Sequence, residues 1–305
     1  MPETGAEEGD PRRLSRTRVF VLGAGIMGSG IAAQCALKGY AVTLADVTEE
    51  LVQRGLANAL RGLDSAVRKG RVRESERSEA AARIETAIGL RRADSAPIVI
   101  EAVPERLELK QQVFRELDAA SAPTAMLATN TSSLPVTSIA RVVEDPGRVV
   151  GLHFFNPVLS MALVEVIPGH STRPEVADAA VAFARSLGKT VVRSRDSPGF
   201  LTSRAVAVGL NEAVWMLYEG VSTRDEIDQA YKLGFGHPMG PLELADLVGL
   251  DTALAILDIL WDGFHDPKYR ACPLLRTLVE AGKLGRKSGE GFYKYEAPPA
   301  ASGPT

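Results

Sequence analysis

Residues 18–37 read RVFVLGAGIMGSGIAAQCAL and contain a G-x-G-x-x-G pattern at Gly23, Gly25 and Gly28. A β-branched apolar stretch precedes these glycines and a helix-forming stretch follows them, which predicts a strand, a tight turn and a helix. In such a unit the first glycine permits the turn, the second lets a pyrophosphate approach the backbone, and the third lets the helix pack on the strand. The N-terminus of the helix also favours bound phosphate. The pattern predicts a dinucleotide site; the alternative is a tight turn that binds nothing.

An acidic residue extends this prediction. Asp46 ends the next predicted strand, 21 residues beyond Gly25. A carboxylate at that place accepts hydrogen bonds from a ribose 2′-hydroxyl and repels a 2′-phosphate, so we expect NAD as the cofactor rather than NADP. The alternative is that Asp46 caps a helix or is a solvated carboxylate at the end of the strand.

Composition excludes several classes of function. Lys and Arg number 35 against 38 Asp and Glu, which does not fit a generally basic surface for nucleic acid or membrane. Cys35 and Cys272 are too few for a disulfide framework, and the four histidines have no metal-ligand spacing, so we expect no metal. The uncharged run from Val19 to Leu37 has the length of a membrane span, but its glycines favour the strand, turn and helix. The N-terminus does not resemble a targeting signal, and we expect a cytoplasmic protein.

The order of the predicted elements divides the chain at Ser197-Pro198-Gly199. Before it, strands and helices alternate, which predicts a parallel sheet covered on both faces. The expected strands are 18–22, 41–46, 97–103, 125–129, 149–153, 162–167 and 190–193, and the expected helical stretches are 25–38, 48–83, 107–120, 134–140 and 174–187. After it we expect helices only, at 201–219, at 223–234 with a capping box at Thr223 and Glu226, from Pro241, from a cap at Asp251 to Trp261, and at 273–281. Residues 1–16 are expected to form a flexible arm and residues 297–305 a disordered tail.

A histidine and a glutamate stand in two apolar strands. His153 ends the strand 149–153, and Glu165 lies in the middle of the run LVEVI. A buried carboxylate is costly without a partner, and adjacent strands could bring it to the imidazole. The carboxylate would then fix the tautomer, so that the other ring nitrogen acts as a base. The alternatives are that a backbone carbonyl satisfies His153 and that Glu165 pairs with an arginine.

Eight segments, in order, make the chain resemble the L-3-hydroxyacyl-CoA dehydrogenase family, with the bacterial 3-hydroxybutyryl-CoA branch most similar. They are GAGIMGSGIA from Gly23, EAVPE (Glu101–Glu105), NTSSL (Asn130–Leu134), GLHFFNP (Gly151–Pro157), LVEVI (Leu163–Ile167), DSPGF (Asp196–Phe200), HPMGPLELAD (His237–Asp246) and GRKSGEGFYKY (Gly285–Tyr295). The resemblance implies an α/β Rossmann-type NAD-binding domain at 17–196. It also implies an all-α domain at 197–296 that binds substrate and forms a homodimer. The substrate would be an acyl-CoA of fatty acid metabolism.

The resemblance also assigns roles to single residues. His153 would take the proton of the 3-hydroxyl group while hydride leaves C3 for the nicotinamide, and Glu165 would orient it. Ser132 would contact the substrate and help to place it, and Ser203 would stand in the substrate site. Cofactor contacts would come from the three glycines and Asp46, and from Ile26, Met27, Ala102, Val103, Glu105, Lys110 and Asn130.

These residues also have simpler interpretations. Ser132 could cap the helix that follows it. Glu105 and Lys110 could form an exposed helical pair of little energetic value. His237 is interpreted as a residue that stabilises a turn, and Phe292, Tyr293 and Tyr295 as packing that docks the C-terminus.

Ser203 departs from the family pattern, because the family usually carries asparagine there. A serine is shorter and offers one hydroxyl in place of an amide carbonyl and NH₂ group. We expect hydride transfer to persist, while the preferred acyl chain stays open. The alternatives are the same chemistry on a non-CoA hydroxy acid or a carrier-protein-tethered acyl group, and an NAD-binding homologue without catalysis.

Overall fold

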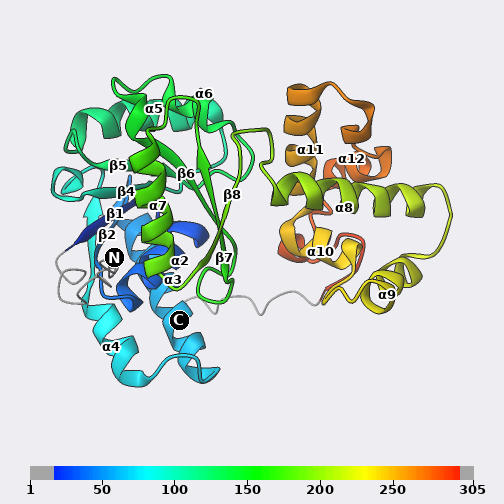
Figure 1. The fold of residues 1–305 in the computed structure, drawn as a ribbon. Helices are drawn as coiled ribbons and strands as arrows, with labels where there is room; N and C mark the ends of the chain where they lie inside the picture. Colours follow the sequence, from blue (N-terminus) through cyan, green and yellow to red (C-terminus); the bar gives the residue numbers. More distant parts are fainter. Residues whose placement is uncertain (1–16, 296–305) are drawn as a thin grey trace, which may run out of the picture. The chain divides into compact units, whose positions relative to one another are not determined.

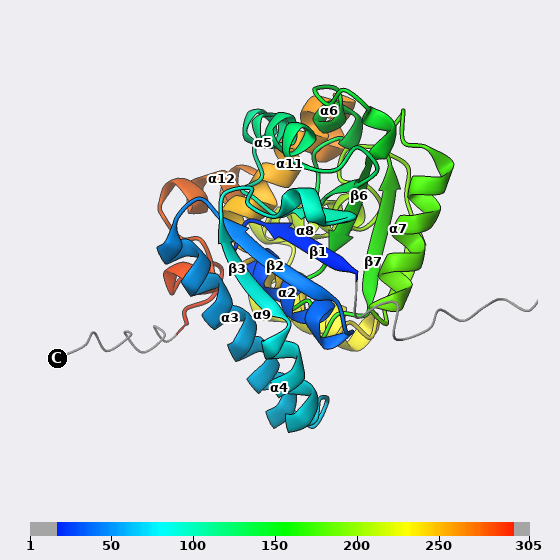
Figure 2. The same cartoon turned by 90° about the vertical axis from the view of Figure 1, so that its left-hand side faces the viewer.

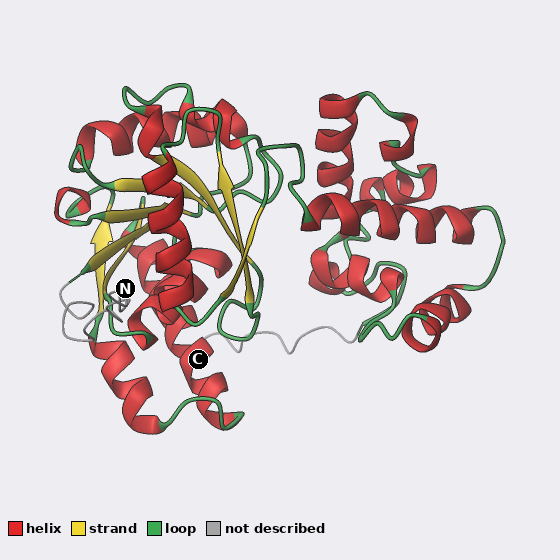
Figure 3. Ribbon diagram, in the orientation of Figure 1, coloured by secondary structure: helices red, strands yellow, loops and turns green. Residues whose placement is uncertain are grey.

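The computed structural model describes residues 17–295, and contacts divide the chain between Asp196 and Ser197 into two units (Figure 1). The arm predicted at 1–16 and the tail predicted at 297–305 lie outside the described residues. The first unit combines a sheet with helices, and the second contains helices without a sheet among its described residues (Figure 3).

The first unit is built on an eight-stranded sheet with the order β3-β2-β1-β4-β5-β6-β7-β8. Its strands are β1 (Arg18–Leu22), β2 (Ala41–Asp46), β3 (Ile84–Ile88), β4 (Ile98–Glu101), β5 (Met126–Thr129), β6 (Val149–Phe154), β7 (Leu163–Pro168) and β8 (Thr190–Arg193). Neighbouring strands run parallel except β6 and β7, which are antiparallel. The prediction of a wholly parallel sheet is therefore wrong at this pair. Residues 155–162 are too short a connection for the crossover that a parallel pair requires.

Helices of the first unit follow the strands in the alternation that the sequence predicts. They are α2 (Ile26–Leu37), α3 (Glu49–Arg68), α4 (Glu74–Ala82), α5 (Leu107–Ala120), α6 (Val136–Ala140) and α7 (Pro174–Ser186). The stretch predicted as helical at 48–83 is two helices, and β3 follows them as an unpredicted strand at the edge of the sheet beside β2 (Figure 2).

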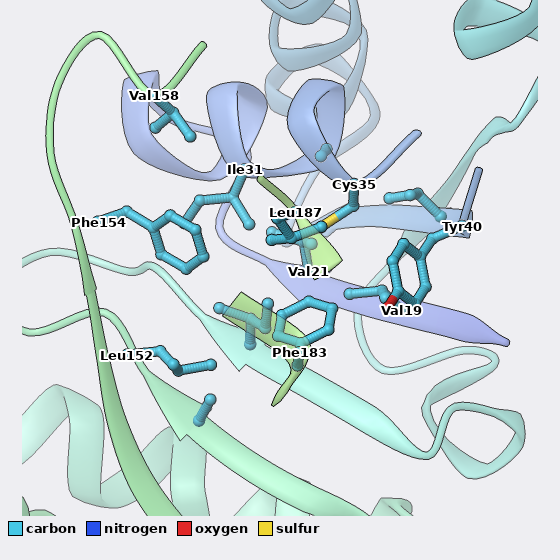
Figure 4. Packing of buried hydrophobic residues seen from close by; sticks show 14 of the residues in the cluster. Val19, Val21, Ile31, Cys35, Tyr40, Leu152, Phe154, Val158, Phe183 and Leu187 are labelled. Atoms are coloured by element: carbon cyan, nitrogen blue, oxygen red, sulfur yellow. The ribbon is translucent and has the colours of Figure 1, made fainter. Parts of the chain in front are cut away.

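The helices α2 and α7 cover the same face of the sheet. The side-chain amide of Gln34 donates to the carbonyl of Leu187 at 2.7 Å, and the hydroxyls of Tyr40 and Ser186 lie 2.6 Å apart. Beneath them, alternate strand residues form a buried apolar core with Cys35 and Phe183 (Figure 4). Each such buried side chain contributes about 2 kcal/mol of hydrophobic stabilisation, which fixes the sheet that carries the site residues.

The second unit consists of α8 (Thr202–Tyr218), α9 (Arg224–Gly234), α10 (Pro241–Val248), α11 (Leu250–Phe264) and α12 (Pro273–Glu280) around its own apolar core. The capping box of Thr223 and Glu226 at the start of α9 is confirmed. The predicted cap at Asp251 is wrong. Gly249, whose φ of +101° suits glycine, precedes α11, and Asp251 instead pairs with Lys287.

Two buried aspartates bind the last described residues to the helices of the second unit. Asp246 accepts hydrogen bonds from the N–H groups of Phe292 and Tyr293 and from the Tyr295 hydroxyl, each at 2.9 Å. Asp228 accepts from the Tyr293 hydroxyl at 2.7 Å and from two N–H groups at the start of α10. The aromatic residues therefore dock the C-terminal segment, as predicted.

Candidate active site

The three glycines between β1 and α2 differ in what surrounds them. Gly23 has a φ of +100°, and a Cβ there would lie 2.6 Å from the Ala102 carbonyl oxygen. A Cβ at Gly28 would lie 1.7 Å from the carbonyl oxygen of Gly23, so helix and loop could not approach as they do. A Cβ at Gly25 would meet no described atom within 4 Å. Gly23 and Gly28 are thus required by packing, whereas Gly25 leaves room on the outer side of the loop.

The N-terminus of α2 faces this room. Gly25 is its N-cap residue, and within residues 17–295 no side chain caps the helix. The first N–H groups of a helix, here those of Ile26 and Met27, carry partial positive charge and suit a phosphate. The loop therefore has both the space and the polarity that a dinucleotide phosphate requires.

Asp46 lies at the end of β2, against the same loop. Its Oδ2 accepts from the Ala24 N–H group and its Oδ1 from the Val47 N–H group, both at 2.7 Å. The N-cap of the following helix is Thr48, whose hydroxyl accepts from Leu51, so the alternative that Asp46 caps a helix is wrong. The carboxylate has further lone pairs with which to accept from a ribose.

A buried lysine lies between two carboxylates at the C-terminal end of β4. The Lys110 side chain is 1% exposed, and its Nζ lies 2.6 Å from Oε1 of Glu101 and 3.4 Å from Oε2 of Glu105. Glu101 is fully buried and also accepts from the Val103 N–H group and the Thr129 hydroxyl, both at 2.7 Å. The alternative of an exposed Glu105–Lys110 pair is wrong, because Lys110 is buried and pairs with the buried Glu101 as well as with the more exposed Glu105.

Glu105 connects this cluster to the segment after β5. Its Oε1 accepts from the Thr131 hydroxyl at 2.6 Å and from the N–H groups of Ser132 and Ser133 at 2.8 and 3.1 Å. Burial by itself would raise the pKa of Glu105, but the Lys110 ammonium and these hydrogen bonds together lower it below its usual range. Glu105 is therefore ionised at neutral pH and fixes the backbone at Ser132.

Ser132 does not cap the next helix. The N-cap residue of α6 is Pro135, and the Asp196 carboxylate accepts from the N–H groups of Val136 and Thr137 at 2.7 Å each. Asp196 belongs to the DSPGF segment, so the last residue of the first unit fixes the helix beside the Ser132 segment.

His153 and Glu165 face each other on β6 and β7. They are directly paired in the antiparallel register, and His153 Nδ1 lies 2.7 Å from Glu165 Oε2. Glu165 is fully buried and His153 is 5% exposed. The side-chain oxygen of Asn130 accepts from the N–H group of Phe154 at 2.9 Å, which ties the end of β5 to β6 beside this pair. The structure thus brings together the imidazole and carboxylate that the sequence predicted to meet.

The first unit also contains a groove that the sequence did not predict. It is lined by Ile26 and Gly30 of α2, by Asn58 of α3, by Lys69 and Arg71 after α3, and by residues 156–160 after β6. Its charged residues lie in the stretch 48–83, whose charge pattern is also that of an ordinary solvated helix face. The glycines are the signal that could have indicated close packing here: a Cβ at Gly30 would lie 2.9 Å from Val158, and one at Gly62 3.1 Å from Leu159.

Ser203 is the one predicted site residue that lies in the second unit. It is the second residue of α8 and is half-buried. Between residues 17 and 295, no group of three His, Cys, Asp or Glu side chains is arranged to hold a metal ion. In the same range, no helix combines the length and the apolar character that crossing a membrane requires.

Comparison with known proteins covers both units. The family described as 3-hydroxyacyl-CoA dehydrogenase, NAD binding domain, matches residues 18–197, and the corresponding C-terminal domain family matches residues 199–295. A probable 3-hydroxybutyryl-CoA dehydrogenase of Bacillus subtilis is 47% identical over 279 residues, which cover 92% of this chain and 97% of that protein. The 3-hydroxybutyryl-CoA dehydrogenase of Bradyrhizobium diazoefficiens is 45% identical over 278 residues, covering 91% and 95%. The crystal structure of the (S)-3-hydroxybutyryl-CoA dehydrogenase from Ralstonia eutropha superposes with a TM-score of 0.87 at 41% identity, covering 92% of this chain and 99% of that chain.

Proposed function

Because this chain belongs to the 3-hydroxyacyl-CoA dehydrogenase family and is an NAD-dependent (S)-3-hydroxyacyl-CoA dehydrogenase, we propose that His153 is the base of its reaction and that Glu165 orients it. The observation that carries this assignment is the 2.7 Å contact between His153 Nδ1 and a fully buried carboxylate. A carboxylate on Nδ1 holds the hydrogen there, so that Nε2 is the nitrogen that exchanges a proton with substrate.

In the oxidation, Nε2 of His153 takes the proton of the 3-hydroxyl group. The Glu165 carboxylate stabilises the imidazolium that forms, because a negative charge in a buried site favours the protonated ring. When bound, NAD accepts the hydride from C3. In the reduction, His153 returns the proton to the 3-oxo oxygen. Ser132, whose backbone Glu105 fixes, would donate its hydroxyl to the same oxygen and hold the substrate in place.

The residues present fit NAD. The uncapped start of α2 and the open space at Gly25 suit the pyrophosphate, and Asp46 suits the ribose. Ala102, Val103 and Asn130 lie at the C-terminal ends of β4 and β5, the edge at which ligands of such sheets bind. Lys110 is buried against Glu101, so we assign it to holding Glu105 and the Ser132 segment rather than to direct contact with the nicotinamide.

The substrate we propose is a short-chain 3-hydroxyacyl-CoA. Support for the short chain comes from the relatives described as 3-hydroxybutyryl-CoA dehydrogenases. Support for the CoA carrier comes from the groove, which begins near the end of β6 and carries the cations Lys69 and Arg71. A CoA thioester is anionic, and these cations supply local positive charge that the net charge of −3 conceals.

A homodimer formed through the second unit is a further part of the proposal. Three large apolar side chains in and beside α9 are strongly exposed, namely Val221 (67%), Leu233 (77%) and Phe235 (69%). Large apolar side chains that are exposed on one unit are typical of protein interfaces. Light scattering should give twice the chain mass, and Phe235→Asp should reduce it. A cytoplasmic location is also proposed, and the bacterial relatives support it.

The experiment that tests the function uses the purified protein with NADH and acetoacetyl-CoA and follows the loss of NADH. Replacing His153 with alanine should lower kcat by about 10³-fold, since a positioned acid–base group contributes between 10² and 10⁴. His170→Ala, at an exposed histidine, is the matched control and should leave kcat unchanged. Full activity in His153→Ala would refute the assigned base. Faster turnover of free 3-hydroxybutyrate than of the CoA thioester would refute the carrier.

A further inference from the structure

One wall of the groove is a short segment without regular secondary structure. Residues 157–161, here called the groove wall, follow β6 and lead towards β7. Val158 is 3% exposed and packs over α2, near Ile31 and Phe154 (Figure 4). Ser160 and Met161 are exposed. A segment with so little buried apolar surface needs other contacts to hold one conformation.

Lys189 supplies such contacts from beneath the segment. It lies between α7 and β8 and is only 8% exposed. Its Nζ donates to the carbonyl oxygens of Val158 at 2.5 Å and Met161 at 2.8 Å. Within residues 17–295, no carboxylate forms an ion pair with this ammonium group. Among the described residues, this buried ammonium group therefore donates its hydrogen bonds to two carbonyl groups of the groove wall.

Such an arrangement is costly for stability. Burial lowers the pKa of Lys189, and the nearby Lys38 ammonium lowers it further. An apolar side chain of similar size would avoid the cost of burying the charge, but it would leave the two carbonyl oxygens without this donor. A methionine in place of Lys189 has no N–H group, so it could not donate to the two carbonyl oxygens and fix their positions.

Other contacts also hold the groove wall in one conformation. The guanidinium group of Arg71 donates to the Ser160 hydroxyl at 2.6 Å, across the groove. Gly30 and Gly62 allow Val158 and Leu159 to approach α2 and α3 more closely than any larger residue would permit. The wall is therefore held from below by Lys189, from the side by two glycine-bearing helices and from across by Arg71.

We propose that Lys189 is a positioning residue for the acyl-CoA substrate. It fixes the groove wall and so sets the width of the groove that receives the CoA thioester. The proposal rests on the proposed function, because the groove is assigned there to the CoA carrier. It predicts that Lys189 acts on the affinity for the CoA substrate and leaves cofactor binding and the chemical step unchanged.

Three variants of the full chain test this role. Lys189→Met should raise the KM for acetoacetyl-CoA about tenfold, with kcat and the KM for NADH within about twofold of the wild type. Lys189→Arg, which keeps the charge and the donors, should restore most of this loss. Lys38→Met is the matched control, since Lys38 is an exposed neighbour of Lys189 that does not contact the groove wall, and it should change neither KM.

Two further measurements distinguish a positioning role of Lys189 from a purely structural role. Hydrogen exchange of the amides of residues 158–161 should become faster in Lys189→Met, and calorimetric binding of coenzyme A should weaken by the same factor as the KM. An unchanged KM for acetoacetyl-CoA in a protein whose groove wall exchanges faster would overturn the proposal. A parallel rise of both KM values with a lower melting temperature would also overturn it, because this is the result of a purely structural residue.

The failure of each proposal is distinguishable. A wild-type protein that binds coenzyme A but consumes no NADH would refute the proposed function, while coenzyme A binding by Lys189→Met would still decide the role of Lys189. If Lys189→Met does not fold, Lys189→Gln replaces it, because the shorter amide side chain removes the charge and cannot reach both carbonyl oxygens. A rise of about threefold in the KM for acetoacetyl-CoA alone supports the proposal, and no change in that KM overturns it.

Discussion

The carboxylate of Asp46 accepts a hydrogen bond from the backbone N–H group of Ala24 at 2.7 Å. This contact joins the end of β2 to the glycine loop, so the group proposed to bind the ribose and the loop proposed to bind the pyrophosphate are held at a fixed separation. A variant at this position must therefore keep the contact with Ala24 if it is to report on the charge alone.

Asp46→Asn meets that condition, because the amide oxygen can still accept from Ala24 while the negative charge is lost. We expect the KM for NADH to rise about tenfold and the use of NADPH to improve, since the repulsion of a 2′-phosphate disappears. The ratio of kcat/KM for the two cofactors measures the change. Asp94→Asn, at an exposed aspartate of the same unit, is the control. An unchanged ratio would show that Asp46 does not select the cofactor.

Glu165→Gln should keep a hydrogen bond to His153 and remove the charge that stabilises the imidazolium. We expect kcat to fall about 100-fold or more, with the KM for acetoacetyl-CoA nearly unchanged. Steady-state kinetics with NADH check this, and circular dichroism checks that the variant folds. Glu175→Gln, at an exposed glutamate, is the matched control. A kcat equal to that of the wild type would contradict the orienting role.

The low pKa of Glu105 predicts a particular dependence of stability on pH. Its folded-state pKa lies below the unfolded value, which is about 4.3. Its ionised form therefore contributes stability that is complete above pH about 4.3 and is lost as the pH falls through the folded-state pKa. Urea unfolding should find Glu105→Gln less stable than the wild type at neutral pH. The difference should shrink in acid.

The control for this prediction is Glu108→Gln, because Glu108 is an exposed residue two positions into α5. Its curve of stability against pH should coincide with that of the wild type. A constant difference between Glu105→Gln and the wild type at every pH would mean that the ionisation of Glu105 does not stabilise the fold.

Asp246→Asn should destabilise the second unit by about 2 to 3 kcal/mol, because its carboxylate accepts three hydrogen bonds while fully buried. Both tryptophans of the chain, Trp215 and Trp261, lie in this unit, so their fluorescence during urea unfolding reports on it alone. Asp258→Asn removes an exposed ion pair with Arg276 and should cost well under 1 kcal/mol. Equal effects of the two changes would contradict the docking role of Asp246.

Much of the first unit was predictable from residue patterns. The strand, turn and helix at residues 18–37 follow from apolar residues and glycines whose roles are local. The edge strand β3 was not predicted, because Glu85 lies within it and a long charged stretch precedes it. The direction of β7 was missed for another reason. An apolar run indicates a strand but carries no information on the direction in which the strand runs in the sheet. That direction depends here on the short connection 155–162.

Only part of the candidate site was predictable from the sequence. His153 and Glu165 were predicted because each is a polar residue within an apolar strand. The burial of Lys110 and Lys189 was not predicted, since a lysine beside other polar residues has the pattern of an exposed one. Their partners lie elsewhere in the chain, at Glu101 for the first and at the carbonyls of Val158 and Met161 for the second. Backbone carbonyls leave no trace in a side-chain pattern.

The reversal between β6 and β7 has a consequence for how the protein folds. In an antiparallel pair the start of one strand meets the end of the other, and so Glu165, near the start of β7, meets His153, near the end of β6. The two residues are separated by only 12 positions in the chain, whereas Gly23 must approach Ala102 to complete the loop beside the cofactor site. Contacts of short sequence separation cost less loop-closure entropy and form faster. The His153–Glu165 pair is thus a low-contact-order part of the molecule, and the loop proposed to bind the cofactor is the part that forms only after distant strands have met.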